Sequence, residues 1–227
     1  MALLEDLVAA YRILAEHEII DAYGHVSARS EERPDRYFMS RSLAPELVTE
    51  ADIQEYDLDS KPVDPNARDS VLERYIHGEI FKTRPDVMAV VHNHSPSVVP
   101  FSITSIELKP LFHMAAFIGE GVPNFEIRDV EMGSDLLVRT TEMGAALAKT
   151  LSDKPAALMR GHGAVVVADS LHVVVAKAYY LNVNARMQLQ AMQLRGDGGV
   201  GLSVEESKKA AQTYERSWDA WKSRLRR

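Results

Sequence analysis

The chain begins with apolar side chains at helical spacing. They are Leu3, Leu4, Leu7, Val8, Tyr11 and Leu14. Because residues three and four apart share one face of a helix, this pattern predicts an amphipathic helix that ends near Glu16 and His17. A glycine turn within residues 22–29 then enters a predicted short strand, and residues 37–40 are predicted to form the strand that returns.

The middle of the chain alternates between turn signals and apolar runs. Between residues 49 and 68, prolines and acids indicate turns rather than a long helix. A helix is predicted from about Asp69 towards Pro85. The β-branched residues within 87–91 then predict a buried strand. Residues 101–110 and 125–130 are further candidate strands.

A helix and a hairpin are predicted next. Residues 133–135, Gly-Ser-Asp, match a cap for a helix that continues to Leu151. Residues 156–159 and 164–168 are predicted to pair as a hairpin, because the glycines in the intervening Arg160-Gly161-His162-Gly163 permit a tight turn.

The last part of the chain is predicted to be helical. Residues 170–194 are apolar almost all round, which predicts a helix that is central in the core or buried against another subunit. Residues 203–206, Ser-Val-Glu-Glu, match a capping box for a final helix that carries Tyr214, Trp218 and Trp221.

Composition narrows the class of protein. With 227 residues, 46% of them hydrophobic, we expect one domain over residues 1–227. The absence of cysteine excludes disulfides, zinc–thiolate sites and cysteine nucleophiles, and is compatible with the cytoplasm. Acids near the N-terminus and the lack of a long apolar run predict a soluble protein that is neither exported nor in a membrane. A net charge of -7 argues against a nucleic-acid surface but permits a small anionic substrate.

Three histidines are candidate metal ligands. His92 and His94 close the strand at 87–91, and residues two apart on a strand share a face, so both imidazoles can reach one divalent ion. A half-buried histidine with a satisfied ring is the ordinary alternative. His162 lies between two glycines, where core packing does not explain an imidazole. Neutral imidazoles suit Mn²⁺, Zn²⁺, Co²⁺ or Fe²⁺ rather than Ca²⁺.

Glu73 is the candidate fourth ligand. It lies at the start of the helix that precedes the strand, but residues 70–73, Ser-Val-Leu-Glu, also match a capping box in which Glu73 bonds to the Ser70 amide. His77 shares the helix face of Glu73, either as a partner of the site or as a packed residue. The spacing of His25 and His113 does not place them.

These motifs together resemble the class II aldolase/adducin domain family. They are Glu73-x-x-x-His77, His92-Asn93-His94 and Gly161-His162-Gly163. The resemblance implies an α/β fold, three-layer α/β/α with a mostly antiparallel central sheet, and a cyclic homotetramer with active sites between subunits. It also implies a divalent metal on His92, His94 and His162, with Glu73 as ligand, catalytic base or both.

Two departures from the family's sugar-phosphate enzymes predict a different substrate. Their phosphate-holding Ser-Ser pair is Val71-Leu72 here, and their Gly-Asn turn is Gly24-His25. Two apolar side chains do not hydrogen-bond a phosphate. Arg41 and Arg160 instead offer forks for carboxylates. With residues 111–113, Leu-Phe-His, this pattern resembles the family's metal-dependent decarboxylases of hydroxylated aromatic or pyridine carboxylic acids.

The resulting hypothesis is a metal-dependent carbon–carbon lyase that decarboxylates such an acid. We expect His25, Arg41 and Arg160 to bind the small anionic substrate, and Glu73 or His113 to protonate the ring carbon. One alternative is an aldolase that acts on a non-phosphorylated hydroxy-carbonyl substrate. Another is a non-catalytic, adducin-like binding module. In each case we expect a homo-oligomer, a tetramer or larger.

Overall fold

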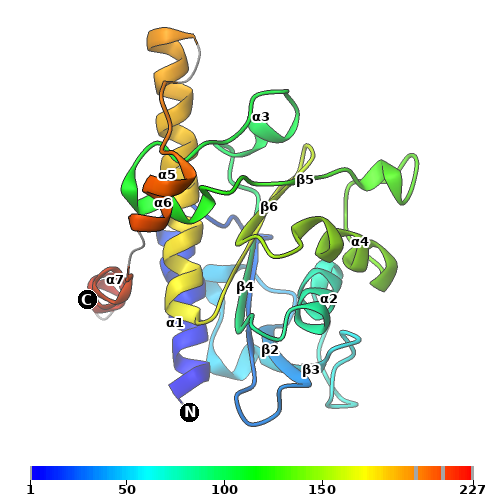
Figure 1. Cartoon of the computed structure of the whole chain (residues 1–227). Coiled ribbons are helices and arrows are strands. Elements are labelled where there is room, and N and C mark those ends of the chain that lie inside the picture. Colours follow the sequence, from blue (N-terminus) through cyan, green and yellow to red (C-terminus); the bar gives the residue numbers. More distant parts are fainter. Residues whose placement is uncertain (1, 197–198, 211–212, 226–227) are drawn as a thin grey trace.

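A mixed sheet lies between two layers of helices (Figure 1). The computed structural model describes residues 2–196, 199–210 and 213–225. Within them the strands are β1 (His25–Arg29), β2 (Arg36–Ser40), β3 (Ile53–Asp57), β4 (Ala89–Asn93), β5 (Asn124–Phe125), β6 (Ala156–Met159) and β7 (Gly163–Ala168). Their order is β3-β2-β1-β4-β7-β6-β5, and neighbours are antiparallel except β5 and β6. The predicted three-layer fold with a mostly antiparallel sheet is confirmed.

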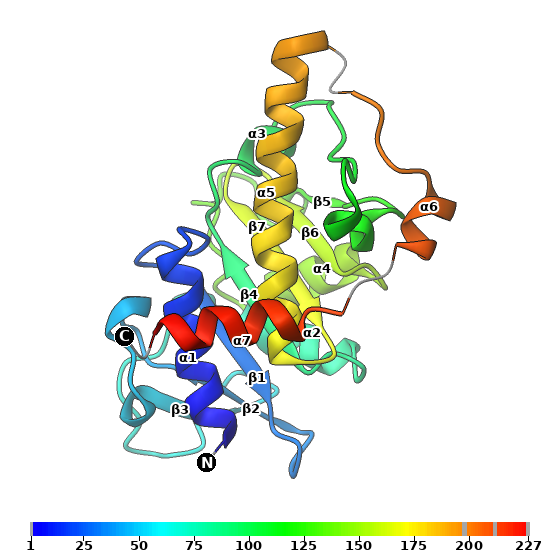
Figure 2. The same ribbon diagram turned by 90° about the vertical axis from the view of Figure 1, so that its left-hand side faces the viewer.

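The helices divide between the two faces of the sheet. One face is covered by α1 (Ala2–Glu16), α5 (Leu171–Arg195) and α7 (Glu215–Arg224), and the other by α2 (Tyr75–Thr83) and α4 (Thr141–Leu151). Figure 2 shows α7 crossing in front of α1 and α5. The short helices α3 (Val99–Ser102) and α6 (Val204–Lys209) lie outside these layers. Among the described residues, no helix has both the length and the apolar character needed to span a membrane.

Strand β4 connects the two cores through the alternation of its side chains. Val91 belongs to the core under α1 and α5, whereas Val90 belongs to the core under α2 and α4. Because side chains two apart share a face, His92 turns to the same side as Val90. The ring of His92 therefore faces the helical layer that contains α2.

The β6–β7 hairpin brings the third histidine to the end of β4. Met159 pairs with Gly163, and Gly161 in the turn has a φ of 64°, which glycine adopts without strain. A Cβ at Gly163 would lie 1.9 Å from the carbonyl oxygen of Asn93, so only glycine permits this approach. The hairpin was predicted, and its close packing places His162 beside His94.

The strand predicted over residues 101–110 is wrong. Two buried amides of α5 bond to this segment instead. Gln188 accepts from the Lys109 amide at 2.8 Å and donates to the Glu107 carbonyl at 2.7 Å. Asn184 likewise accepts from the Leu111 amide and donates to the Lys109 carbonyl, both at 2.7 Å. Because side chains satisfy this backbone, it needs no neighbouring strand.

Other boundaries also differ from the predictions. Strand β3 lies in the region where the sequence indicated turns rather than a long helix, and α2 begins after a separate 3₁₀ turn at Leu72–Arg74. Of residues 125–130, Phe125 ends β5, while Ile127–Asp129 is a 3₁₀ helix. The Ser203 capping box is confirmed, but its helix α6 ends at Lys209. Trp218 and Trp221, which were predicted to lie on that helix, belong to a separate helix, α7.

The helix predicted from residues 133–135 starts later than expected. Helix α4 begins at Thr141, and the side chain of Thr140 caps it by accepting from the Met143 amide at 3.2 Å. Leu136 has a φ of 74°, which is incompatible with a continuous right-handed helix. The segment before α4 is held instead by side chains of the histidine site described below.

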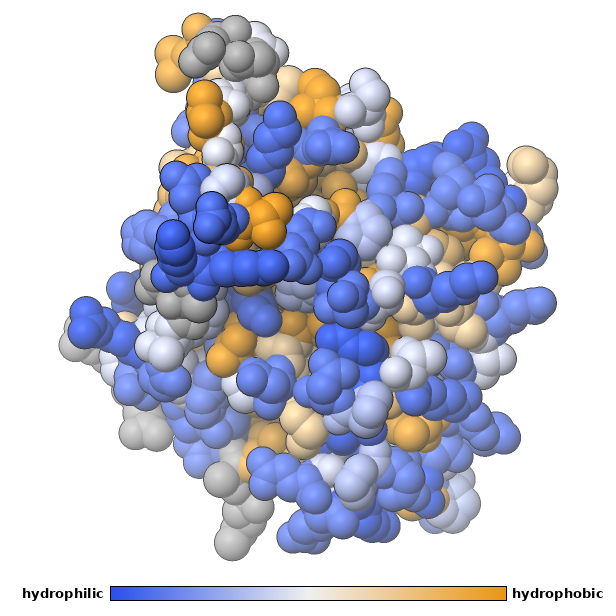
Figure 3. Space-filling model, viewed as in Figure 1, coloured by the Kyte–Doolittle hydropathy of each residue, from blue (hydrophilic) through white to orange (hydrophobic). Residues whose placement is uncertain are grey.

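Helix α5 extends past the sheet at its C-terminal end (Figure 1). Leu194, near that end, is 90% exposed. Most of the face shown in Figure 3 is hydrophilic, and hydrophobic patches interrupt it towards the outer end of α5. The outer end of α5 is therefore only partly covered within one chain.

Candidate metal centre

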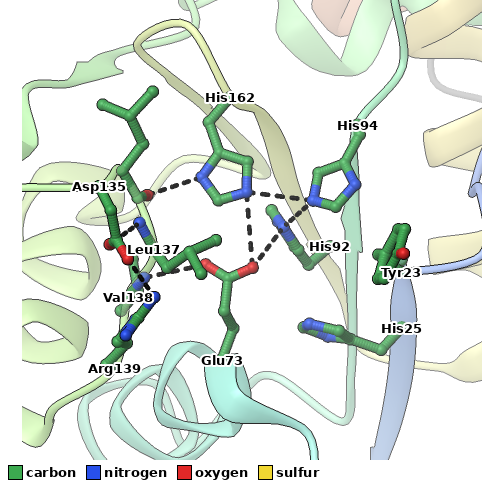
Figure 4. A network of polar contacts seen from close by, with 12 residues as sticks. Tyr23, His25, Glu73, His92, His94, Asp135, Leu137, Val138, Arg139 and His162 are labelled. Atoms are coloured by element: carbon green, nitrogen blue, oxygen red, sulfur yellow. Dashed lines mark hydrogen bonds and ion pairs between the residues drawn. The ribbon is translucent and has the colours of Figure 1, made fainter. Parts of the chain in front are cut away.

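Three imidazoles and one carboxylate converge at the end of the sheet (Figure 4). His94 Nε2 lies 3.0 Å from His92 Nε2 and 3.1 Å from His162 Nε2. Glu73 Oε2 lies 3.5 Å from the Nε2 atoms of both His92 and His162. One ligand atom from each of these residues lies within 4.8 Å of every other. The structure brings together the four residues predicted as metal ligands.

Three separate segments supply these groups. His92 lies on β4, and His94 follows directly after the strand. His162 lies in the β6–β7 turn, and Glu73 in the 3₁₀ turn before α2. That turn covers the sheet face to which His92 points, so the Glu73 carboxylate lies next to the imidazole rings.

Each imidazole has an oxygen partner at its other nitrogen. His92 Nδ1 lies 3.2 Å from the Ala164 carbonyl oxygen, and His162 Nδ1 lies 2.9 Å from that of Leu136. His94 Nδ1 lies 3.0 Å from Asp21 Oδ1. These oxygens only accept, so the neutral rings carry their protons on Nδ1 and turn Nε2 lone pairs towards one another.

This donor set fits a divalent cation. Three lone pairs and a carboxylate oxygen facing one point repel one another unless a cation lies between them. Ligands roughly 2.0–2.1 Å from one ion lie about 2.8–3.4 Å apart at octahedral or tetrahedral angles, and the four spacings given above are 3.0–3.5 Å. Nitrogen and carboxylate donors together suit Mn²⁺, Zn²⁺, Co²⁺ or Fe²⁺.

Glu73 does not form the capping box that was the alternative to a ligand role. The 3₁₀ turn at Leu72–Arg74 has no side-chain cap, and Glu73 Oε1 accepts from the Val138 amide at 2.9 Å. Burial opposes ionisation of Glu73, but the neighbouring imidazoles of His162 and His92 outweigh it and hold its pKa below the ordinary value. Glu73 is therefore a carboxylate, the form that binds metals.

Burial affects the histidines of the site unequally. Burial lowers the pKa of His92 to about 4, although Glu73 partly opposes this. For His162, burial again favours the neutral ring, but Glu73 outweighs it and raises the pKa above 6.5. His162 is therefore the more basic of these two rings when no metal is bound.

A pocket of about 640 Å³ opens onto the cluster. Its apolar wall consists of Leu43, Val71, Leu72, Leu136 and Leu137. Asp21 and Asp135 also line it, and none of the described lining residues is a lysine or an arginine. Arg139 pairs with Asp135 beside the pocket (Figure 4). The pocket therefore combines a metal-binding end with an apolar wall.

The other predicted site residues have different surroundings. His25 lines the pocket and is buried. Arg41 instead pairs with Asp52, with Nε 2.8 Å from Oδ1, and Arg160 pairs with Glu126, with Nε 2.7 Å from Oε2. His113 is exposed. Of these four residues, only His25 lines the pocket of its own chain.

The sequence-based prediction missed Asp21. Its carboxylate bonds to His94 and also accepts from the Tyr23 and Gly24 amides, at 2.9 and 3.0 Å. Although burial opposes ionisation, these amides and His94 lower the pKa of Asp21. An aspartate shortly before a glycine predicts a turn in which the carboxylate accepts from nearby backbone amides. It does not predict the contact with the distant His94.

Known proteins resemble this chain in sequence or in fold. A decarboxylase, tropJ, from Talaromyces stipitatus is 38% identical, and the match covers 94% of this chain and 90% of that protein. A 3,4-dihydroxyphthalate decarboxylase from Arthrobacter keyseri is 29% identical over 85% of this chain and 79% of its own. The crystal structure of an aldolase II superfamily protein from Pseudomonas syringae superposes with a TM-score of 0.80 at 21% identity, covering 97% and 90% of the two chains.

The family model for the class II aldolase and adducin N-terminal domain matches residues 5–189. This range contains Glu73, His92, His94 and His162, and the family resemblance of their motifs is thereby confirmed. The chain belongs to the class II aldolase and adducin N-terminal domain family.

Proposed function

We propose that this protein is a divalent-metal-dependent carboxy-lyase that acts on a hydroxylated aromatic or heteroaromatic carboxylic acid. The observation that carries the proposal is the arrangement of His92, His94 and His162, whose Nδ1 atoms all face oxygen acceptors while their Nε2 atoms face one another and Glu73. The similarity to two proteins named as decarboxylases supports the choice of reaction.

The pocket wall supports an aromatic substrate. Val71 and Leu72 both line it, and Leu72 is 58% exposed, so it offers apolar surface to a ring. A phosphate would find neither a cation nor a serine pair at these positions. The lining provides no cation for a second carboxylate far from the metal. We therefore propose that the substrate's anionic groups lie at the metal-binding end.

The chain's own residues have distinct roles in this proposal. His92, His94, His162 and Glu73 hold the metal, which when bound polarises the substrate carboxylate and its neighbouring oxygen. Because the pKa of Glu73 is lowered, its role is that of ligand or base rather than acid. His113 is exposed outside the pocket of its own chain, so a catalytic role for it requires the pocket of a neighbouring subunit.

Release of CO₂ tests the proposal directly. The protein would be stripped of metal, loaded separately with Mn²⁺, Zn²⁺, Co²⁺ or Fe²⁺, and assayed with hydroxybenzoates, 3,4-dihydroxyphthalate and pyridine carboxylates. We expect CO₂ release only with metal. Aldehyde formation from a non-phosphorylated hydroxy-carbonyl compound, without CO₂ release, would support the aldolase alternative. Activity that survives complete removal of metal would contradict the proposal.

We also propose that the protein is a homo-oligomer. The outer end of α5 extends beyond the sheet, and its apolar Leu194 is exposed there within one chain. Light scattering at micromolar concentration should give a mass several times the 25.3 kDa of one chain. A mass equal to that of one chain would contradict the proposal.

A further inference from the structure

A second group of buried polar residues lies beside the metal site. His25 on β1 pairs in register with His92 on β4, and the two rings lie 5.0 Å apart. Ser27 is two residues further along β1, so it shares the face of His25. Helix α2 covers this face and places His77 against both residues. His25 is 2% exposed, and His77 and Ser27 are fully buried.

These residues form a continuous hydrogen-bonded chain. His77 Nδ1 lies 2.5 Å from Ser27 Oγ, and His77 Nε2 lies 2.6 Å from His25 Nδ1. The remaining nitrogen, His25 Nε2, is buried without a hydrogen-bond partner in the described structure. His25 lines the pocket, and Figure 4 shows its ring beneath His92, pointing towards Glu73. The chain therefore ends in an unpaired nitrogen beside the proposed metal.

The direction of the hydrogen bonds follows from the serine. Ser27 Oγ has His77 as its one side-chain partner among the described residues. If His77 donated to Ser27, the serine proton would be buried without an acceptor, which is unfavourable. If Ser27 donates instead, His77 Nε2 carries its ring's proton and donates it to His25 Nδ1. His25 then carries its own proton on Nε2, the ring nitrogen that has no partner in the described structure.

Two further observations agree with this direction. Burial lowers the pKa of His77 to about 3, so its ring is neutral and has one proton to donate. Glu73, towards which His25 points, is a carboxylate, and an N–H facing that charge is favoured over a lone pair. Both observations favour the tautomer in which His25 Nε2 is a donor.

We propose that Ser27 and His77 are positioning residues that hold His25 as an Nε2–H donor to a substrate oxygen at the metal-binding end of the pocket. This inference rests on the proposed function for the identity of the substrate. As CO₂ leaves, negative charge accumulates on the oxygen conjugated with the ring, and a fixed donor aimed at that oxygen stabilises the charge. The described lining contains neither lysine nor arginine. We therefore expect the neutral N–H of His25 to donate a hydrogen bond to an anionic or hydroxyl oxygen of the substrate.

A spectrum of the Zn²⁺-loaded protein tests the tautomer without any substrate. The protein would be labelled with ¹⁵N-histidine, and long-range ¹H–¹⁵N correlations would show which ring nitrogen carries each proton. His25→Gln assigns the His25 signals. We expect an Nε2–H tautomer for His25, whereas the proposed ligands carry Nδ1–H. An Nδ1–H tautomer or an imidazolium at His25 would overturn the inference, whether or not any compound is decarboxylated.

A matched pair of variants tests the role of His77. Gln has an amide nitrogen close to the position of His77 Nε2, so His77→Gln keeps a donor to His25, whereas His77→Leu has similar bulk and no donor. With metal content unchanged, we expect kcat to fall about 10–100-fold in His77→Leu, with a smaller change in KM. His77→Gln should recover most of this loss. Equal losses in two folded, metal-loaded variants would refute a positioning role.

Variants of Ser27 and His25, the two ends of the hydrogen-bonded chain, complete the test. Ser27→Ala removes the terminal donor with little change in volume, so it should fold even if His77→Leu does not, and should lower kcat in the same direction. His25→Phe should lower kcat by about 100-fold while retaining metal. Wild-type kcat and KM in His25→Phe would refute the substrate contact. If the wild type releases no CO₂, the proposed function fails, but the spectrum still decides the tautomer.

Discussion

Two groups of histidines lie side by side at the ends of β1 and β4, and they differ in the partners of their ring nitrogens. In one, His92, His94 and His162 each turn Nδ1 to an oxygen and Nε2 to a common point. In the other, His25 Nδ1 faces a nitrogen of His77, so one ring must donate and the other accept.

The partner of one ring nitrogen therefore determines the chemistry of the other. An oxygen that only accepts requires a proton on Nδ1 and leaves Nε2 as a metal ligand. A donor at Nδ1, as we infer for His25, leaves Nε2 as a hydrogen-bond donor. The four predictions below test this contrast, from the largest expected effect to the smallest.

Removal of a ligand should have the largest effect. His162→Ala removes one of the converging nitrogens. Loss of a ligand's hydrogen-bond partner typically lowers metal affinity or activity by about 10–100-fold, and we expect loss of the ligand itself to lower both by more than this. Elemental analysis after dialysis measures the bound metal. His172→Ala is the matched control, because His172 lies near Asp6 and away from the pocket. Equal metal content in both variants would show that the cluster is not a metal site.

Loss of a ligand's partner should have a smaller effect. Asp21→Ala removes the acceptor of His94 Nδ1 and frees the ring to change tautomer, so metal affinity should fall by about 10–100-fold. Asp135→Ala is the control, because Asp135 also lines the pocket but pairs with Arg139. Competition with a chelator measures both affinities. The contrast between the two histidine groups would be weakened if the Asp135 variant lost more affinity than the Asp21 variant.

Acid should weaken metal binding through His162. In the metal-free protein the pKa of His162 lies above 6.5, so below that pKa the ring holds a proton that must leave before metal binds. Affinity should therefore be greatest at high pH and fall by up to about tenfold per pH unit as pH decreases through this pKa. Zn²⁺ titrations between about pH 8 and pH 6 measure this dependence. A constant affinity across this range would exclude His162 as the titrating ligand.

The two arginines should have the smallest effect. Arg41 pairs with Asp52 and Arg160 with Glu126, outside the described pocket lining. We expect Arg41→Lys and Arg160→Lys to keep their metal and to change kcat/KM by less than about threefold, with a stability loss of at most about 1 kcal/mol. Steady-state kinetics and thermal unfolding measure both quantities. A tenfold rise in KM for either variant would show that its arginine contacts substrate, in the pocket of a neighbouring subunit.

Local pattern was sufficient for the elements that carry the histidines. The valines of β4 predicted its strand, and the spacing of His92 and His94 predicted that their rings share a site. The glycines around His162 predicted a tight turn. These inferences held because strand periodicity and glycine conformations depend on neighbours in the sequence.

Local pattern failed where a distant group satisfies the backbone. Glu73 matched a capping box, yet it accepts from the Val138 amide and faces the histidines. The segment before α4 resembled a helix start, yet its Leu136 carbonyl accepts from His162. Residues 101–110 resembled a strand, yet two amides of α5 bond to their backbone or that of the next residue. No local preference reveals such partners.

The sequence was thus enough for the candidate ligands and for a family resemblance that implied the layered fold, because turn residues and motif spacing are properties of the chain order. The tertiary structure decided which nitrogen of each histidine faces the pocket, that Asp21 supports His94, and that Arg41 and Arg160 pair with acids elsewhere. It also joined Ser27, His77 and His25 into one chain, because β1 and α2 meet only when the sheet and its helical layer pack together.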